Sequence, residues 1–421
     1  SKEFKDDEKH TLMVSFLGRF FGKDQSSEFI NTPVFGEINF NDQQTDTKFK
    51  QADYTLKIDY TDPISEKVIL ETGVQYVTND VGNDFEVRNL EDGIWVPDEG
   101  LTNDFEYDQK VLGIYGTGSY KGAKWGAKLG LRVESTDLQT LLVNTEESND
   151  QNFTDLFPTL HTSFKLNQTF SLQAGYSRRI YRPRLWDLNP FFNIRNNFNI
   201  RQGNPNLQPE YSDSFEFTGI LDLDKASING SLYHLYTTDV IERISVVEDN
   251  VNTTMPVNIG TNSAVGVEMN VKYEPLKWLT VNGDFNYNRF VRNGELEGQV
   301  FDFNGDQWTS RLTTKLSLPA QIDLEITGNF ESGYQTVQTD FARNTYADIG
   351  VRKKIIKGRG VINMAVRDIF ASRIWIGEID DPQFYLYTES TRGRFFTVGF
   401  SYGFGKGEAM TYSGGRRGGF R

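Results

Sequence analysis

The sequence predicts an all-β protein, an antiparallel transmembrane β-barrel, and three observations support this fold class. Apolar and polar residues alternate along many segments of strand length. Tight turns alternate with long polar connections along most of the chain. The 421 residues include 32 Phe, 19 Tyr and 6 Trp, yet mean hydropathy is negative. A barrel combines these properties because only alternate residues face lipid and aromatic residues gather at the membrane interfaces.

Composition excludes several other classes of protein. No apolar run approaches the roughly 18 residues of a membrane-spanning helix, so no such helix is expected. The formal net charge is −14 and no strongly basic face is evident, which argues against a nucleic-acid partner. The absence of cysteine excludes disulfides and thiolate metal sites. A soluble all-β protein is the alternative to a membrane barrel.

The alternation is clearest in two consecutive segments, 265–273 and 279–288. In the second segment Val281, Phe285 and Tyr287 share one face, and amide or acidic residues such as Asp284 share the other. A small soluble barrel would fill its interior with apolar side chains, so here the apolar face must point outward. We therefore expect Val281, Phe285 and Tyr287 to face lipid. The residues expected to face the lumen are Asn282, Asp284 and Asn286.

Turn residues divide the chain into about sixteen strands. The first strand is expected at about 11–21. Tight turns are expected at Asp62-Pro63, Lys121-Gly122, Leu166-Asn167, Asp224-Lys225, Glu274-Pro275, Leu318-Pro319 and Lys357-Gly358. Long connections are expected at 22–46, 79–104, 138–155, 182–209, 238–261, 290–301, 333–340 and 371–392. Short turns on one side and long loops on the other are typical of outer-membrane barrels.

Features of an enzyme are weak in this sequence. The three histidines, His10, His161 and His234, are far apart and suggest no metal triad, and no phosphate-binding loop or nucleophile elbow is present. Acidic loop residues such as Asp80 and Asp84 have the chemistry to hold Ca²⁺, although solvated loop charge is the simpler interpretation. We therefore expect no enzymatic activity, no cofactor and no metal site.

The two ends of the chain carry little apolar sequence. The chain opens Ser1-Lys2-Glu3-Phe4 and shows no signal peptide. This start is therefore expected to be either a mature N-terminus or a cut within a longer chain. Residues 405–421 are rich in Gly and Arg and are expected to form a periplasmic tail.

Several short motifs occur in a fixed order between residues 100 and 405. The most informative is the stretch Gly203-Asn204-Pro205-Asn206-Leu207-Gln208-Pro209-Glu210. The others are Gly130-Leu131-Arg132-Val133-Glu134, Phe157-Pro158-Thr159-Leu160, Tyr176-Ser177-Arg178-Arg179-Ile180, Asp187-Leu188-Asn189-Pro190-Phe191, Gly266-Val267-Glu268 and Arg367-Asp368-Ile369-Phe370. With these motifs the chain resembles the barrel region of TonB-dependent outer-membrane receptors, in particular the outer-membrane protein β-barrel family.

The resemblance implies a location, a function and a set of partners. Such receptors sit in the cell outer membrane in contact with its lipid and have barrels of about 22 strands closed by an N-terminal plug domain. This chain shows no plug-like segment, so residues 1–404 are expected to be the C-terminal majority of the barrel and not to close by themselves. The resemblance implies TonB-dependent uptake of an extracellular siderophore, cofactor, oligosaccharide or peptide, with the TonB complex acting through the plug. A non-transporting surface barrel for adhesion or assembly, or a passive 16-stranded porin, are the alternatives.

The Gly203–Glu210 stretch has a structural interpretation. Pro205 and Pro209 favour extended backbone, while Gly203, Asn204 and Asn206 favour turns. The stretch is expected to clamp a long loop to the strand that starts near Tyr211, beyond which Glu216 should point into the lumen. Its expected structural residues are Gly203, Asn204, Pro205, Asn206, Leu207, Pro209, Glu210 and Glu216.

The segment 178–201 is the candidate for substrate binding, because arginines alternate there with aromatic residues. Guanidinium groups beside aromatic rings suit an anionic or ring-bearing ligand. The residues expected to contact substrate are Arg184, Trp186 and Arg195. The alternative is that these arginines pair with lumen carboxylates or with outer-leaflet phosphates.

Overall fold

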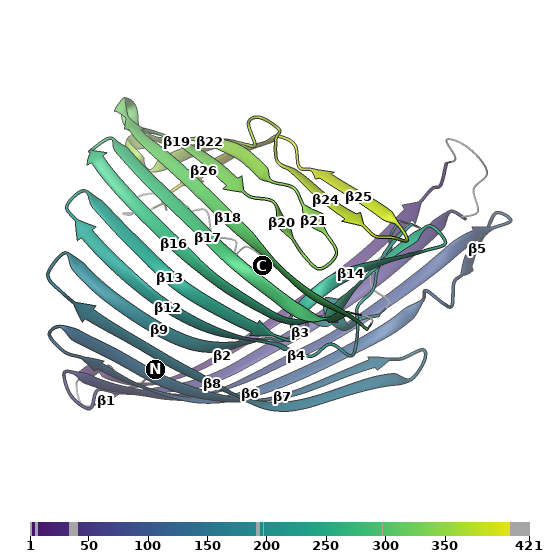
Figure 1. The fold of residues 1–421 in the computed structure, drawn as a ribbon, viewed down its shortest axis with the longest axis horizontal. Coiled ribbons are helices and arrows are strands. Elements are labelled where there is room, and N and C mark those ends of the chain that lie inside the picture. Colours follow the sequence, from purple (N-terminus) through teal and green to yellow (C-terminus); the bar gives the residue numbers. More distant parts are fainter. Residues whose placement is uncertain are drawn as a thin grey trace.

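A computed structural model describes residues 2–4, 7–32, 41–190, 194–196, 198–296 and 298–404. Most of these residues form one 18-stranded antiparallel sheet that curves strongly (Figure 1). Apart from the short strands β1 (Lys2–Phe4) and β5 (Ile94–Pro97), the sheet contains the sixteen strands that the sequence predicts. The predicted tail, 405–421, lies outside the described residues. None of the helices in the described part has the length and apolar character needed to cross a membrane.

Each long strand pairs with the next long strand along the chain. The first eight are β2 (Asp7–Phe29), β3 (Gln43–Asp62), β4 (Val68–Glu91), β6 (Asn103–Lys121), β7 (Trp125–Leu142), β8 (Glu147–Lys165), β9 (Phe170–Tyr181) and β12 (Glu210–Leu223). The second eight are β13 (Ala226–Thr238), β16 (Gly260–Leu276), β17 (Leu279–Leu296), β18 (Gln299–Leu318), β19 (Ile322–Glu331), β22 (Asn344–Ile355), β23 (Gly360–Arg367) and β26 (Phe395–Tyr402). Tight turns join strands at six of the seven predicted positions, and the turn predicted at Glu274-Pro275 lies at Lys277-Trp278 because β16 continues to Leu276.

Two further sheets belong to the long loops. One joins β10 (Ile194–Asn196), β11 (Asn199–Arg201), β15 (Val251–Asn258) and β14 (Ile241–Glu248), with β11 parallel to β15. The other joins β20 (Tyr334–Gln335), β21 (Asp340–Phe341), β24 (Ile374–Asp380) and β25 (Tyr385–Thr391). Both lie away from the tight turns, at the end of the sheet that we take as extracellular (Figure 1).

The prediction of long irregular loops was wrong at several positions, because strands continue past the membrane. Apart from 33–40 and 297, which lie outside the described residues, the loops predicted at 22–46, 79–104, 138–155 and 290–301 are largely strand. Strand β4 has 24 residues, where about 9–11 suffice to cross a bilayer. The first strand likewise runs over Asp7–Phe29 instead of 11–21. Antiparallel pairing satisfies the backbone polar groups as well in water as in lipid, so charged sequence does not end a strand.

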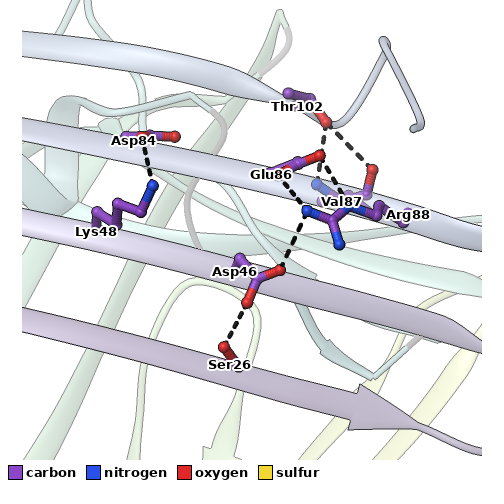
Figure 2. Close-up of polar contacts among 8 residues, drawn as sticks. All are labelled: Ser26, Asp46, Lys48, Asp84, Glu86, Val87, Arg88 and Thr102. Atoms are coloured by element: carbon purple, nitrogen blue, oxygen red, sulfur yellow. Dashed lines mark hydrogen bonds and ion pairs between the residues drawn. The ribbon is translucent and has the colours of Figure 1, made fainter. Parts of the chain in front are cut away.

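Charged side chains form contacts between neighbouring strands along this extension (Figure 2). Arg88 on β4 lies 2.7 Å from Glu86 and 3.6 Å from Asp46 on β3, and Ser26 on β2 donates to Asp46. The hydrogen bond from Arg88 lowers the pKa of Glu86 below its ordinary value. Lys48 and Asp84 form a further pair at 3.9 Å, so Asp84, a candidate Ca²⁺ ligand in the sequence, lies beside a lysine.

The lipid-facing and lumen-facing sides follow the predicted alternation. Strand β17 pairs Tyr287 with Trp308 and Phe285 with Ser310 on one face, and Asp284 with Arg311 on the other. Leu312, which is 56% exposed, belongs to the same outward face. On β3 this face changes from Leu56 and Tyr54 to charged residues near Lys50, which marks the outer boundary of the apolar band.

The sheet has two open edges among the described residues. Strand β26 pairs with β23 alone, and no pairing joins it to β2. The prediction that the first strand has no N-terminal partner was wrong for its first residues, because β1 pairs with β2 as far as Leu12. Beyond Leu12 no described strand pairs with the outer edge of β2, so the described strands form a curved wall that does not close on itself, as expected.

A charged residue in the apolar band tests this orientation. Phe285→Arg should lower the free energy of unfolding by about 2–4 kcal/mol, because the guanidinium would meet hydrocarbon. Asn288→Arg is the matched control on the lumen face of the same strand, where its cross-strand neighbours, Gly266 and Gln307, are uncharged. Denaturant titration of the protein in liposomes would show the difference. Equal losses in the two variants would contradict the assignment of faces.

Candidate functional site

The loop between β9 and β12 folds onto the inner wall at the extracellular end of the barrel. Its short helix α1 (Leu185–Leu188) and the later Leu207 bury three leucines in one apolar cluster with wall residues. Those wall residues come from β3, β4, β6 and β7: Phe49, Val81, Phe105, Tyr107, Leu138 and Leu142. Apolar residues on an otherwise polar inner wall therefore hold this loop against the barrel.

The Gly203–Leu207 part of the Gly203–Glu210 stretch forms the contact between the two halves of the loop. Gly203 donates to the carbonyl of Asn189 at 2.8 Å, and a Cβ at Gly203 would lie 2.5 Å from that oxygen. Asn204 closes a turn, since its side chain accepts from the Asn206 N–H at 3.0 Å and its carbonyl accepts from Leu207 at 3.2 Å. A glycine is therefore required for close backbone approach at position 203, and the turn directs Leu207 into the cluster.

The same stretch also forms hydrogen bonds with the barrel wall and with the β14–β15 hairpin. Gln151 on β8 donates to the carbonyls of Pro205 and Leu207 at 3.3 and 3.1 Å. Asn258 exchanges two hydrogen bonds with the main chain of Gln208, at 2.8 and 3.0 Å.

The end of the stretch joins the loop to the β14–β15 hairpin. Pro209 is buried, and the Glu210 carboxylate accepts from the Ile241 N–H at the start of β14. Burial raises the pKa of Glu210 above its ordinary value.

Glu216, the last of the predicted structural residues, lies on the lumen face of β12. It lines a polar recess of about 400 Å³ together with Lys128 and His161. Its neighbours Phe215 and Phe217 are 49% and 50% exposed on the outward face.

Asp187 is the polar centre of the loop. This buried carboxylate accepts from the Tyr181 hydroxyl at 3.1 Å, from the Arg184 N–H at 3.2 Å and from the Arg243 guanidinium at 3.0 Å. Burial and the negative charge of Asp187 raise the pKa of Tyr181 to about 12. Arg243 belongs to β14, so the carboxylate ties the two neighbouring loops together.

A second buried charge network anchors the start of the loop. Arg182 lies 2.6 Å from Glu134 on β7 and donates to Thr136 at 3.0 Å. Arg132 also donates to Glu134 and reaches Gln75 on β4 at 3.1 Å. One carboxylate thus forms ion pairs with two guanidinium groups on the inner wall.

A third loop, 332–343, is held against the β14–β15 hairpin. The amide of Gln338 makes two hydrogen bonds of 2.8 Å with the main chain of Ser245, and the Val337 N–H donates to Glu242 at 3.0 Å. Arg292, at the extracellular end of β17, forms an ion pair with the same Glu242. Three long loops therefore form one connected surface above the wall.

The predicted substrate residues occupy different positions in this surface. The exposed Arg184 has its guanidinium 5.8 Å from the centroid of the Tyr181 ring. Trp186 is 40% exposed and stacks on Phe49 with ring centroids 5.0 Å apart. Arg195 belongs to β10, and its side chain lies outside the described part of the structure. Arg178 and Arg182, in the same arginine-rich segment, pair with Asp213 and Glu134.

Sequence reasoning missed Arg243, which lies in a separate loop. Its side chain is 59% exposed while it pairs with Asp187, the helix residue next to Trp186. No motif indicates this pairing, because the two residues are 56 positions apart. Within the described ranges, no group of three His, Cys, Asp or Glu side chains is placed to hold a metal ion. The groups that the site presents to a ligand are the guanidinium groups of Arg184 and Arg243 and the indole ring of Trp186.

Comparison with known proteins identifies the fold. A family model described as "Outer membrane protein beta-barrel family" matches residues 2–402. Among solved structures, the copper transporter OprC has a TM-score of 0.67 at 11% identity, covering 94% of this chain and 65% of its own. The ferric citrate transporter FecA, in its unliganded form, has a TM-score of 0.63 at 12% identity, covering 94% and 60%.

A third solved structure agrees with these two. The ferric yersiniabactin uptake receptor FyuA from Yersinia pestis has a TM-score of 0.62 at 12% identity, covering 92% of this chain and 58% of its own. The chain thus spans less than two thirds of each of the three proteins. No curated protein sequence matches it.

Proposed function

Because the chain belongs to the outer membrane protein β-barrel family and lies in the cell outer membrane, we propose that it forms most of the wall of a receptor for active nutrient uptake. The observation that carries the proposal is the loop surface around Asp187. Loops that are held rigidly on the inner wall expose Arg184, Trp186 and Arg243 to solvent. Such a surface suits capture of an anionic ligand, such as a metal chelate, before it enters the lumen.

The lumen face of the wall below these loops is suited to the passage of a ligand. Its lumen face carries charged and amide side chains, among them Lys128, Glu216 and Asn286, which offer weak and multiple contacts. We therefore propose transport without catalysis. Siderophore, cofactor, oligosaccharide and peptide remain the substrate classes to be tested.

Energy coupling is a further part of the proposal. As in the receptors that the chain resembles, a plug domain would close the lumen and connect it to the TonB complex. The open edges of β2 and β26 support a larger barrel, because unpaired strand edges are not stable in hydrocarbon. Additional strands, to a total of about 22, would pair with both edges.

Growth experiments test the transport proposal. A strain lacking the protein should fail to grow on one member of a panel of ferric chelates, copper salts, cobalamin and oligosaccharides supplied at limiting concentration. Loss of TonB should give the same defect on the same nutrient. Normal growth on the whole panel would favour a surface barrel for adhesion or assembly. Uptake that persists without TonB would favour a porin.

The predicted substrate residues can be tested together. Simultaneous replacement of Arg184, Trp186 and Arg195 by Ala should reduce uptake of that nutrient while leaving barrel assembly intact, since loops tolerate change better than strands. Heat-modifiable migration on gels would verify assembly. Unchanged uptake by a correctly inserted triple variant would assign this loop to structure and move the search to 79–104 and 238–261.

A further inference from the structure

An apolar groove lies on the outward face of the wall near its extracellular end. It has a volume of about 320 Å³ and crosses three neighbouring strands, β18, β19 and β22. The surface that it exposes is mainly apolar and comes from Leu312, Gly328, Phe330, Ala347 and Phe370, with Ser310, Thr345 and Ser372 also in the lining. The register places Leu312 beside Gly328 and Gly328 beside Ala347, so the groove follows one outward-facing row.

The groove exists because small residues stand between large ones. A Cβ built on Gly328 would meet no atom within 4 Å, so the floor of the groove is open space. Phe330 packs against Trp308 with ring centroids 4.2 Å apart and forms one wall. Phe370 is 68% exposed and forms part of the extracellular rim.

A capped turn after β23 holds Phe370 in this position. The Asp368 carboxylate, in a residue that is 3% exposed, accepts from the N–H groups of Ser372 and Arg373 at 2.9 and 3.0 Å. Ser372 in turn donates to the carbonyl of Thr345 on β22 at 2.7 Å. These hydrogen bonds hold the turn in one conformation, and the turn therefore holds the Phe370 side chain on the lipid side of the wall.

Two exposed arginines lie at the same end of the apolar band. Arg394 donates to the carbonyl of Ile369 at 3.0 Å, next to Phe370, and lies two residues before the outward-facing Phe396 of β26. Arg343 lies two residues before Thr345, which also lines the groove. On β4 and β6 the corresponding boundary carries acidic residues instead. Asp84 and Asp104, for example, lie opposite each other on these two strands.

We propose that this groove binds an acyl chain of a phosphorylated glycolipid of the outer leaflet, with its phosphate on Arg343 and Arg394. The outward face of the band is in lipid, so a lipid chain is the occupant available to it. Outer-leaflet glycolipids carry anionic phosphates next to their acyl chains, and guanidinium groups bind phosphate well. The proposal depends on the outer-membrane location and not on the transport function.

Lipid retention by the purified protein tests the proposal. The protein in detergent would be incubated with deep-rough lipopolysaccharide, washed, and analysed by native mass spectrometry. Gly328→Leu fills the groove with an apolar side chain and should reduce retention at least about tenfold. Gly118→Leu is the matched control, because Gly118 is an outward-facing glycine on β6 with nothing within 4 Å of its added Cβ. Its retention should equal that of the unchanged protein.

A second variant tests the headgroup contact with no change inside the groove. The double change Arg343→Gln and Arg394→Gln should lower retention by about fivefold per arginine. The same double variant should retain dephosphorylated lipopolysaccharide as well as the unchanged protein does. Full retention by Gly328→Leu, or an equal loss in Gly118→Leu, would overturn the groove. Equal retention of both lipids by the unchanged protein would overturn the phosphate contact.

Discussion

Replacing Glu134 with glutamine is expected to lower the free energy of unfolding by about 3 kcal/mol, because it leaves two largely buried guanidinium groups without a counter-charge. The side chains of Glu134 and Arg182 are 12% and 17% exposed, and Arg132 is also largely covered. Glutamine keeps the size and one acceptor oxygen, so the loss would come from charge and not from a cavity. Equilibrium denaturation in liposomes measures it.

An exposed ion pair on the same lumen wall provides the control. Glu71 lies 2.7 Å from Lys128, with side chains 41% and 46% exposed. Solvent screens this pair, so Glu71→Gln should cost less than about 1 kcal/mol. If the Glu134 and Glu71 variants lose the same small amount, the Arg182–Glu134–Arg132 network does not anchor the loop.

Gly203→Ala is the second change for which we expect a large effect. The added Cβ would lie 2.5 Å from the carbonyl oxygen and 2.6 Å from the nitrogen of Asn189, and backbone atoms cannot move aside as a flexible side chain can. The cost should be about 1–3 kcal/mol, with loss of the hydrogen bonds that Gly203 and Asn204 donate to Asn189 and Asp187.

Hydrogen exchange would locate this effect. The amides of Asn204, Asn206 and Leu207 should exchange faster in Gly203→Ala, while those of the barrel strands stay protected. Gly100→Ala is a control in another extracellular loop, because its Cβ would approach only the Asp98 carboxylate, at 3.4 Å. Unchanged protection of the Asn204, Asn206 and Leu207 amides in Gly203→Ala would show that the loop is held in another way.

The wall could be predicted from local sequence because its determinants are local. Alternation decides which face meets lipid, as in the run from Val281 to Tyr287, and residues such as Pro63 and Pro319 end the strands at the periplasmic turns. The strand extensions could not be predicted in this way. They depend on backbone pairing between strands, such as β3 with β4 at Lys48 and Asp84, whose partners are distant in sequence and whose charge resembles that of an irregular loop.

The candidate site was only partly predictable for a related reason. Composition indicates that 178–201 is rich in arginine and aromatic residues, but not which arginines find carboxylates. The structure pairs Arg182 with Glu134 and Arg178 with Asp213, and these pairings depend on where each carboxylate lies on another strand. Arg243 joins the site through Asp187, and its own sequence context carries no motif.

Single-cysteine scanning along β17 tests the membrane orientation of the wall most directly. The chain has no cysteine, so each introduced thiol would be the only one in this chain. In cells or liposomes, Val281→Cys, Phe285→Cys and Tyr287→Cys should react with a lipid-soluble maleimide and resist a charged one. Asn282→Cys, Asp284→Cys and Asn286→Cys should react with the charged reagent through the lumen. Reversed reactivity, or reactivity without alternation, would contradict a membrane barrel with a polar lumen.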